Sequence, residues 1–207
     1  LKKSLEKDSV SNLFYIWGEE GVGKSYIMQA LNKELIGLNK KTLHLSLDDT
    51  RITSPEILKN LDSLEAILIE KLDKLEKTND WETQLFNLVN EALNSETKIY
   101  LSSNIVSKDL EIELKDLKSR LSYFTAIEIP EITQDEKIDA LRQSSARRGI
   151  ELDEKTIDFI LNHTSRSLSD LLRLINEIDL YSLKKKRKVT PYLIRELLKV
   201  KSDKNHI

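Results

Sequence analysis

A glycine-rich segment near the start of the sequence constrains the fold more than any other part. It fits the phosphate-binding pattern G-x-x-x-x-G-K-[ST]. The candidate binding residues are those of the pattern and the one residue after it: Gly18, Glu19, Glu20, Gly21, Val22, Gly23, Lys24, Ser25 and Tyr26. Glycines let the backbone approach a phosphate closely, and the N–H groups of the loop and of the next helix then point at the anion. In such a loop the lysine reaches the β- and γ-phosphates, and the Ser25 hydroxyl binds Mg²⁺.

The segments on both sides of this loop are those that the pattern requires. Residues 13–17 read Leu-Phe-Tyr-Ile-Trp, an apolar run typical of a buried parallel strand. After the loop, Ile27, Leu31 and Leu35 recur at helical spacing. The order strand, glycine-rich loop and helix therefore favours a phosphate-binding loop, and the alternative is an ordinary glycine-rich turn.

The composition suits one or two soluble domains and permits the cytoplasmic location that we expect. The 207 residues are 39% hydrophobic and 33% charged, and the net charge of −2 gives no general attraction to nucleic acid or membranes. The absence of cysteine excludes disulfides and thiolate metal sites. His44, His163 and His206 lack the spacing of a metal site and are interpreted as ordinary core or surface residues. No apolar run approaches the ~18 residues that span a bilayer, and no signal peptide is visible.

Apolar runs alternate with helical patterns up to residue 130. The predicted strands are 13–17, 42–47, 66–69, 99–102 and 125–129, and the predicted helices are 24–36, 54–61, 79–94 and about 109–121. Such alternation predicts a parallel sheet with helices on both faces. Ligands of such sheets bind at the carboxyl ends of the strands, where the glycine-rich loop already lies.

The character of the sequence changes at Pro130, after which no strand pattern occurs. Thr133 and Glu136 have the spacing of a capping box, and Asp153 and Thr190 suit helix N-caps, with Pro191 at a first helical position. The predicted helices are 134–148, 153–163, 167–183 and 190–199. We therefore predict an α/β nucleotide-binding domain over residues 1–131 and a small helical domain over residues 132–207.

A phosphate-binding loop of this kind needs a second strand that ends in a carboxylate for Mg²⁺. The best candidate is the run Ala-Ile-Leu-Ile that ends in Glu70, whose position suits an indirect Mg²⁺ contact. The next residue, which is often an acid that activates the attacking water, is Lys71. An ammonium group cannot accept a proton from water near neutral pH unless it is strongly desolvated. We therefore expect slow intrinsic hydrolysis, while the alternative is that Glu70 only ends a buried strand.

Several motifs, in order, resemble those of one family. They are the phosphate-binding loop with the strand before it, the segment Trp81–Asn90, the strand end Leu101-Ser102-Ser103-Asn104, the segment Leu117–Tyr123, and the segment that runs from Asp135 to Leu152. Together they resemble the DnaA-related branch of the AAA+ family, over nearly the whole chain, and within it the short Hda-like regulatory inactivators of DnaA. The sequence shows no helix-turn-helix DNA-binding domain after the helical part, which favours the Hda-like type over DnaA.

The resemblance implies a fold and roles for single residues. It implies an AAA+ P-loop NTPase core with a parallel five-stranded sheet and a small C-terminal α-helical lid domain. Arg120 matches the arginine finger, which acts on the γ-phosphate of a neighbouring protein, and Asn104 matches sensor 1. Their alternative readings are a surface or structural arginine and a turn-forming asparagine.

The helical part departs from the family pattern at one position. Ser169 stands where the family usually has the sensor 2 arginine, and Arg166 or Arg173 lies within one helical turn of it. We therefore expect the lid to sense the γ-phosphate weakly. Further along, the basic run Lys184–Lys188 is either a weak DNA contact or a solvated loop.

The resemblance implies a regulator of chromosome replication initiation that prevents over-initiation. Its own cofactors would be ADP or ATP with Mg²⁺, held through Ser25 and Glu70, and it would stimulate hydrolysis of ATP bound to a DnaA-type initiator. The further partners implied are a DNA-loaded sliding clamp, reached through an N-terminal segment that the sequence does not show, and a second copy of the chain. The alternatives are a stand-alone ATPase or helicase-loader-like remodeller, and an adaptor that binds DnaA without supplying a finger.

Overall fold

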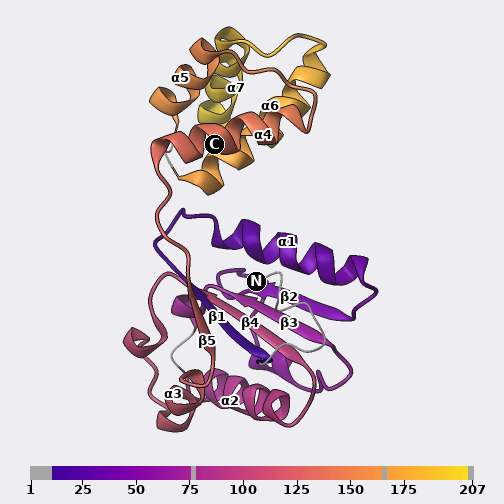
Figure 1. Ribbon diagram of the computed structural model, residues 1–207, viewed down its shortest axis with the longest axis vertical. Coiled ribbons are helices and arrows are strands. Elements are labelled where there is room, and N and C mark those ends of the chain that lie inside the picture. Colours follow the sequence, from indigo (N-terminus) through magenta and orange to yellow (C-terminus); the bar gives the residue numbers. More distant parts are fainter. Residues whose placement is uncertain (1–10, 76–77, 165–166, 205–207) are drawn as a thin grey trace. The chain divides into compact units, whose positions relative to one another are not determined.

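The first part of the chain forms a five-stranded parallel sheet. The structure is a computed structural model, and it describes residues 11–75, 78–164 and 167–204. The strands are β1 (Leu13–Trp17), β2 (Thr42–Ser46), β3 (Ala66–Glu70), β4 (Lys98–Ser103) and β5 (Thr125–Glu128). Their order in the sheet is β2-β3-β4-β1-β5, and every neighbouring pair is parallel. The prediction of an α/β fold with a parallel five-stranded sheet is therefore confirmed (Figure 1).

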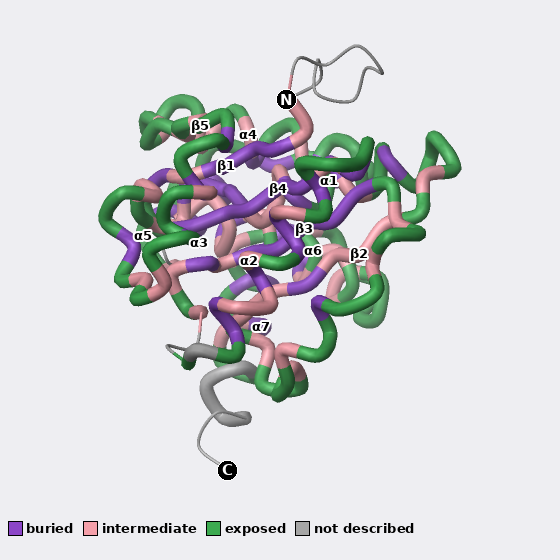
Figure 2. The backbone as a smooth tube through the Cα atoms, turned by 90° about the horizontal axis from the view of Figure 1, so that it is seen from below, coloured by how far each residue is buried: buried purple, intermediate pink, exposed green. Residues whose placement is uncertain are grey.

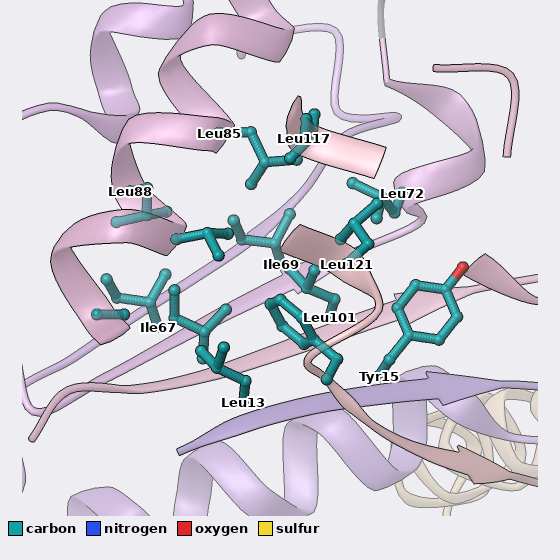
Figure 3. Packing of buried hydrophobic residues seen from close by; sticks show 14 of the residues in the cluster. Leu13, Tyr15, Ile67, Ile69, Leu72, Leu85, Leu88, Leu101, Leu117 and Leu121 are labelled. Carbon is teal, nitrogen blue, oxygen red and sulfur yellow. The ribbon is translucent and has the colours of Figure 1, made fainter. Parts of the chain in front are cut away.

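The helices of this part cover both faces of the sheet. Helix α1 (Lys24–Gly37) lies on one face, while α2 (Asn79–Leu93) and α3 (Lys115–Leu121) lie on the other (Figure 1). On the α1 face, Met28 and Leu31 pack with Ile16, Leu68 and other strand residues. The larger core lies on the α2 and α3 face, and Figure 3 shows strand and helix side chains interdigitating there.

The apolar runs form strands because both of their faces are buried. Every residue of β3 is buried, and so are Leu13 to Ile16 of β1 (Figure 2). Burying one aliphatic side chain contributes about 1.5–3 kcal/mol, so a run of such residues favours a central strand. The edge strand β5 is mostly exposed in comparison.

Two predicted helices are shorter than the pattern suggested. The prediction of a helix over 54–61 was wrong, because only the 3₁₀ turn η2 (Pro55–Leu58) forms, and Lys59 is extended after it. The region about 109–121 contains a 3₁₀ turn, η4 (Ser107–Asp109), and the helix α3 starts only at Lys115. Another 3₁₀ turn, η3 (Leu72–Lys74), follows β3.

The second part of the chain is helical. It consists of α4 (Gln134–Ala146), α5 (Glu154–His163), α6 (Leu168–Lys185) and α7 (Pro191–Lys204). The capping box of Thr133 and Glu136 is confirmed, and so are the N-cap of Asp153 and Pro191 as a first helical residue. The core of this part consists of residues such as Leu141, Ile160, Ile175 and Ile194, which pack together.

The backbone separates into two compact units near Pro130. One unit contains residues 1–20 and 24–130, and the other contains residues 21–23 and 131–207. No helix among the described residues is long and apolar enough to cross a membrane.

Candidate functional site

The carboxyl ends of β1, β3 and β4 bring the predicted site residues of the first unit to one edge of the sheet. Trp17 of β1 is paired with Ser103 of β4, and Ile69 of β3 is paired with Leu101. As a result, Gly18 follows β1, Glu70 ends β3 and Asn104 follows β4 at the same edge. This is the edge at which parallel α/β sheets bind ligands.

Lys24 begins α1 and turns back towards its own loop. Its side-chain ammonium group donates to the carbonyl oxygens of Gly18 and Glu19, at 2.7 Å each. The residue is buried, and burial lowers the pKa of the ammonium group, against the attraction of Asp73 and Glu20. A buried cation held only by neutral carbonyl oxygens and distant carboxylates is suited to receive an anion.

The loop has backbone conformations that a phosphate-binding loop requires. Gly21 and Gly23 have φ angles of 86° and 100°, which side chains other than glycine rarely allow. Val22 is buried, whereas Glu19 and Glu20 are exposed. Ser25 and Tyr26 follow in the first turn of α1 and are half-buried. The residues present therefore fit a nucleotide phosphate in loop geometry and in charge.

Glu70 is buried and contacts a residue of the neighbouring strand. Its Oε1 atom lies 2.6 Å from the Nε2 atom of His44 on β2. His44 and Glu70 lie on the same face of the sheet because they are diagonal neighbours, with Ser46 directly opposite Glu70. His44, interpreted from sequence as an ordinary core or surface residue, is therefore the partner of the predicted Mg²⁺ residue.

Mg²⁺ would find few protein ligands in this arrangement. The described residues contain no cluster of three or more His, Cys, Asp or Glu side chains that could hold a metal ion. Mg²⁺ commonly keeps several waters and takes only one or two protein carboxylates besides phosphate oxygens. A hydroxyl from Ser25 and an indirect contact from Glu70 fit that habit, so the donor set suits Mg²⁺ only together with a nucleotide.

The residue after Glu70 is Lys71, which offers no carboxylate to the site. Its ammonium group is already ion-paired with the Asp48 carboxylate, and the hydrogen bond from Lys71 lowers the pKa of Asp48. Its own backbone is left-handed, with φ at 60°. The position that often holds a water-activating acid is therefore occupied by a lysine that is ion-paired with Asp48.

Asp73 is a functional candidate that sequence reasoning missed. One oxygen accepts from the Asn104 backbone N–H at 2.9 Å and from the Ser103 hydroxyl at 3.2 Å, and the other accepts from the Asn104 amide at 3.0 Å. The η3 turn brings Asp73 back to the strand ends. There its negative charge favours a higher pKa of the Lys24 ammonium group, against the effect of burial. The available signal was an acid three residues after Glu70.

Arg120 stands apart from the loop residues. It lies on α3, which packs on the opposite face of the sheet from α1 (Figure 1). Its guanidinium carbon is 5.6 Å from the centre of the Tyr123 ring, and Tyr123 is 56% exposed.

Two of the residues singled out in the second unit, Ser169 and Arg173, lie on α6. Ser169 is half-buried in the first turn of α6, whose N-cap is Ser167. Arg173 is ion-paired with Asp170 on the same helix at 2.6 Å, and Arg166 lies outside the described residues. Of the two candidate arginines, the one that the structure describes, Arg173, is therefore already ion-paired on its own helix.

Glu196 of α7 holds two residues of the basic run. Lys185 is 2.7 Å from this carboxylate and Arg187 is 3.6 Å from it. These contacts lower the pKa of Glu196, chiefly through the hydrogen bond from Lys185. The run is thus partly neutralised by its own unit, and Lys184, Lys186 and Lys188 are exposed.

Comparisons with known proteins show what the chain is similar to. Residues 134–198 match the family described as the lid domain of Hda. An uncharacterised protein of Haemophilus influenzae is 28% identical over 203 residues, which cover 96% of this chain and 87% of that protein.

Several solved structures share the fold of most of this chain. AMPPCP-bound DnaA from Aquifex aeolicus has a TM-score of 0.70 at 22% identity, covering 88% of this chain and 60% of that one. Domain III of Thermotoga maritima DnaA also has a TM-score of 0.70, at 17% identity, covering 90% of this chain and 82% of that one. The RuvB branch-migration motor of Thermotoga maritima has a TM-score of 0.61 at 15% identity, covering 91% and 61% of the two chains. The comparisons therefore show that this chain shares the fold of these DnaA and RuvB structures, and that residues 134–198 are similar to the lid domain of Hda.

Proposed function

We propose that this chain is a nucleotide-binding regulator of replication initiation, which stimulates hydrolysis of ATP bound to a DnaA-type initiator. Its own nucleotide, ADP or ATP, would serve as a structural ligand rather than as a substrate. The observation that carries the proposal is the pair Glu70 and Lys71, because His44 contacts the first side chain and Asp48 pairs with the second. These contacts support the proposal that the chain hydrolyses its own nucleotide slowly, since a lysine stands where a water-activating acid is common.

The chain's own residues would bind nucleotide as follows. The loop N–H groups and Lys24 would hold the phosphates, exchanging the carbonyl partners of the ammonium group for phosphate oxygens. Ser25 and Glu70 would hold Mg²⁺, which would neutralise phosphate charge when bound. Asn104, fixed by Asp73, would stand beside the phosphates as sensor 1. Ser169 would leave the lid without a cation at the sensor 2 position.

Arg120 would act on the partner's nucleotide instead. A guanidinium group is always charged and presents a planar fork to phosphate oxygens. Arginine fingers supplied in trans contribute on the order of 10³–10⁵ in rate. The position of Arg120 on α3, on the other face of the sheet from Lys24, supports action on a second molecule.

The remaining partners are proposals that follow from the family resemblance. They are the DNA-loaded sliding clamp, a weak DNA contact through the basic run Lys184–Lys188, and a second copy of the chain. All five residues of that run are exposed, and two of them, Lys185 and Arg187, are already ion-paired with Glu196.

The test compares two rates of ATP hydrolysis. The full-length protein is assayed alone, and then with ATP-loaded DnaA and clamp-loaded DNA. We expect little turnover by the chain alone and a clear rise in hydrolysis of the ATP on DnaA. Brisk turnover by the chain alone would favour a stand-alone ATPase or loader, and the absence of stimulation would contradict the proposal.

A further inference from the structure

The start of α3 is held by a buried carboxylate from another helix. Glu82 lies in the first turn of α2 and is only 2% exposed. Its two oxygens accept from the backbone N–H of Glu113 at 3.0 and 3.1 Å, and one of them accepts from the N–H of Leu114 at 2.6 Å. These N–H groups come directly before Lys115, the first residue of α3. Hydrogen bonds to an ionised acceptor are stronger than neutral ones, so Glu82 fixes where α3 begins.

The far end of α3 holds Arg120 against an aromatic ring. The backbone N–H of Tyr123 donates to the Arg120 carbonyl at 3.0 Å, which turns the ring back towards the arginine. The guanidinium carbon then lies 5.6 Å from the ring centre, within the range of a cation–π contact. Leu117 and Leu121 are buried beneath, so the helix cannot roll without losing core contacts.

We propose that Glu82 and Tyr123 are positioning residues that hold Arg120 ready for a phosphate on a partner molecule. The inference rests on the proposed function for the identity of that phosphate. A charged group that is already oriented needs no reorganisation when the reaction begins. A displacement of about 1 Å at such a group can cost on the order of 100-fold in rate. Glu82 sets the helix that carries the arginine, and Tyr123 sets the direction of its side chain.

The contact between Tyr123 and Arg120 can be tested without any partner. In the free protein, nuclear magnetic resonance would measure the ring-current shift of the Arg120 side-chain protons. We expect this shift to be lost in Tyr123→Leu and retained in Tyr123→Phe, because phenylalanine keeps the ring. Tyr192→Leu is the matched control, since Tyr192 is 71% exposed on α7. An Arg120 spectrum that does not change in Tyr123→Leu would overturn the role of Tyr123.

The functional test measures how strongly the chain stimulates hydrolysis of the ATP bound to DnaA. At saturating concentrations of the chain, we expect Tyr123→Leu to lower the maximal rate about 2- to 5-fold. Glu82→Gln should lower it about 10-fold, with Glu91→Gln as the control on the exposed side of the same helix. The concentration for half-maximal stimulation should change little in either variant. A change in that concentration alone would mean that these residues serve docking, and would overturn the positioning role.

The two proposals can fail separately. If the unchanged chain does not stimulate hydrolysis, the proposed function is wrong, and the Arg120 spectrum alone then decides whether Tyr123 positions the arginine. Thermal unfolding of Glu82→Gln shows whether the variant is folded. If it is unfolded, the decision passes to Tyr123→Leu, which changes an exposed side chain.

Discussion

Glu70 and Lys71 are neighbours at the end of β3, yet their side chains meet different residues. Glu70 is buried beside His44, and Lys71 is paired with Asp48 nearer the solvent. Sequence alone could not predict these pairs, because both partners come from β2 and its following loop, more than 20 residues away in the sequence. Asp73 was missed for a related reason: only the η3 turn brings it to Asn104. The P-loop could be predicted because its spacing is local.

At the residue scale we also predict a pH effect at Tyr15. Burial raises the pKa of this phenol well above 10.0, and its hydroxyl donates to the Ile105 carbonyl at 2.7 Å. Above pH ~10 the unfolded chain loses this proton while the folded chain keeps it. The stabilisation that the neutral phenol contributes is therefore complete below that pH. It is lost as the pH rises towards the folded-state pKa.

The measurement is urea unfolding of the unchanged protein and of Tyr15→Phe. Near pH 8, the variant should be less stable by about 1 kcal/mol, because it lacks one hydrogen bond. Between about pH 10 and 11.5 this difference should shrink or reverse, by up to about 1.4 kcal/mol per pH unit. The other tyrosines are common to both proteins and cancel. A difference that stays constant across this range would contradict a raised pKa at Tyr15.

At the scale of elements, the sequence predicted those strands and helix starts that depend on neighbouring residues in the sequence. Runs buried on both faces became parallel strands, and capping patterns marked helix starts correctly. The failures occurred where another element decides. The region before Lys115 does not continue as helix, because Glu82 of α2 takes the N–H groups of Glu113 and Leu114. Such a contact cannot be read from the sequence of the segment itself.

The capping box at the start of α4 gives a prediction for a single element. Thr133 accepts from the Glu136 backbone N–H at 3.3 Å, and the Glu136 carboxylate accepts from the Thr133 N–H at 2.8 Å. Thr133→Ala should lower the free energy of unfolding by about 1 kcal/mol. Thr133→Ser keeps the hydroxyl and should change it far less. Chemical denaturation followed by circular dichroism measures both, and equal losses in the two variants would contradict the capping role.

At the scale of the whole molecule, the chain divides into an α/β unit and a helical unit. Residues 134–198 of the helical unit match the Hda lid domain, and the α/β unit carries Lys24, Ser25 and Arg120. We propose that the nucleotide of this chain has a structural part and that the chemistry takes place on a partner. The structural part rests on Glu70 and Lys71, and the action on a partner is tested at Arg120.

The most direct measurement is single-turnover hydrolysis of ATP bound to DnaA, with clamp-loaded DNA and a saturating amount of this chain. We predict that Arg120→Ala lowers the rate to that of DnaA without the chain, a loss of about 10³-fold or more. Arg120→Lys should recover little, because a lysine lacks the planar fork, and Arg173→Ala on α6 should behave as the unchanged chain. Full stimulation by Arg120→Ala would contradict the account and leave the chain as an adaptor that docks on DnaA without supplying a finger.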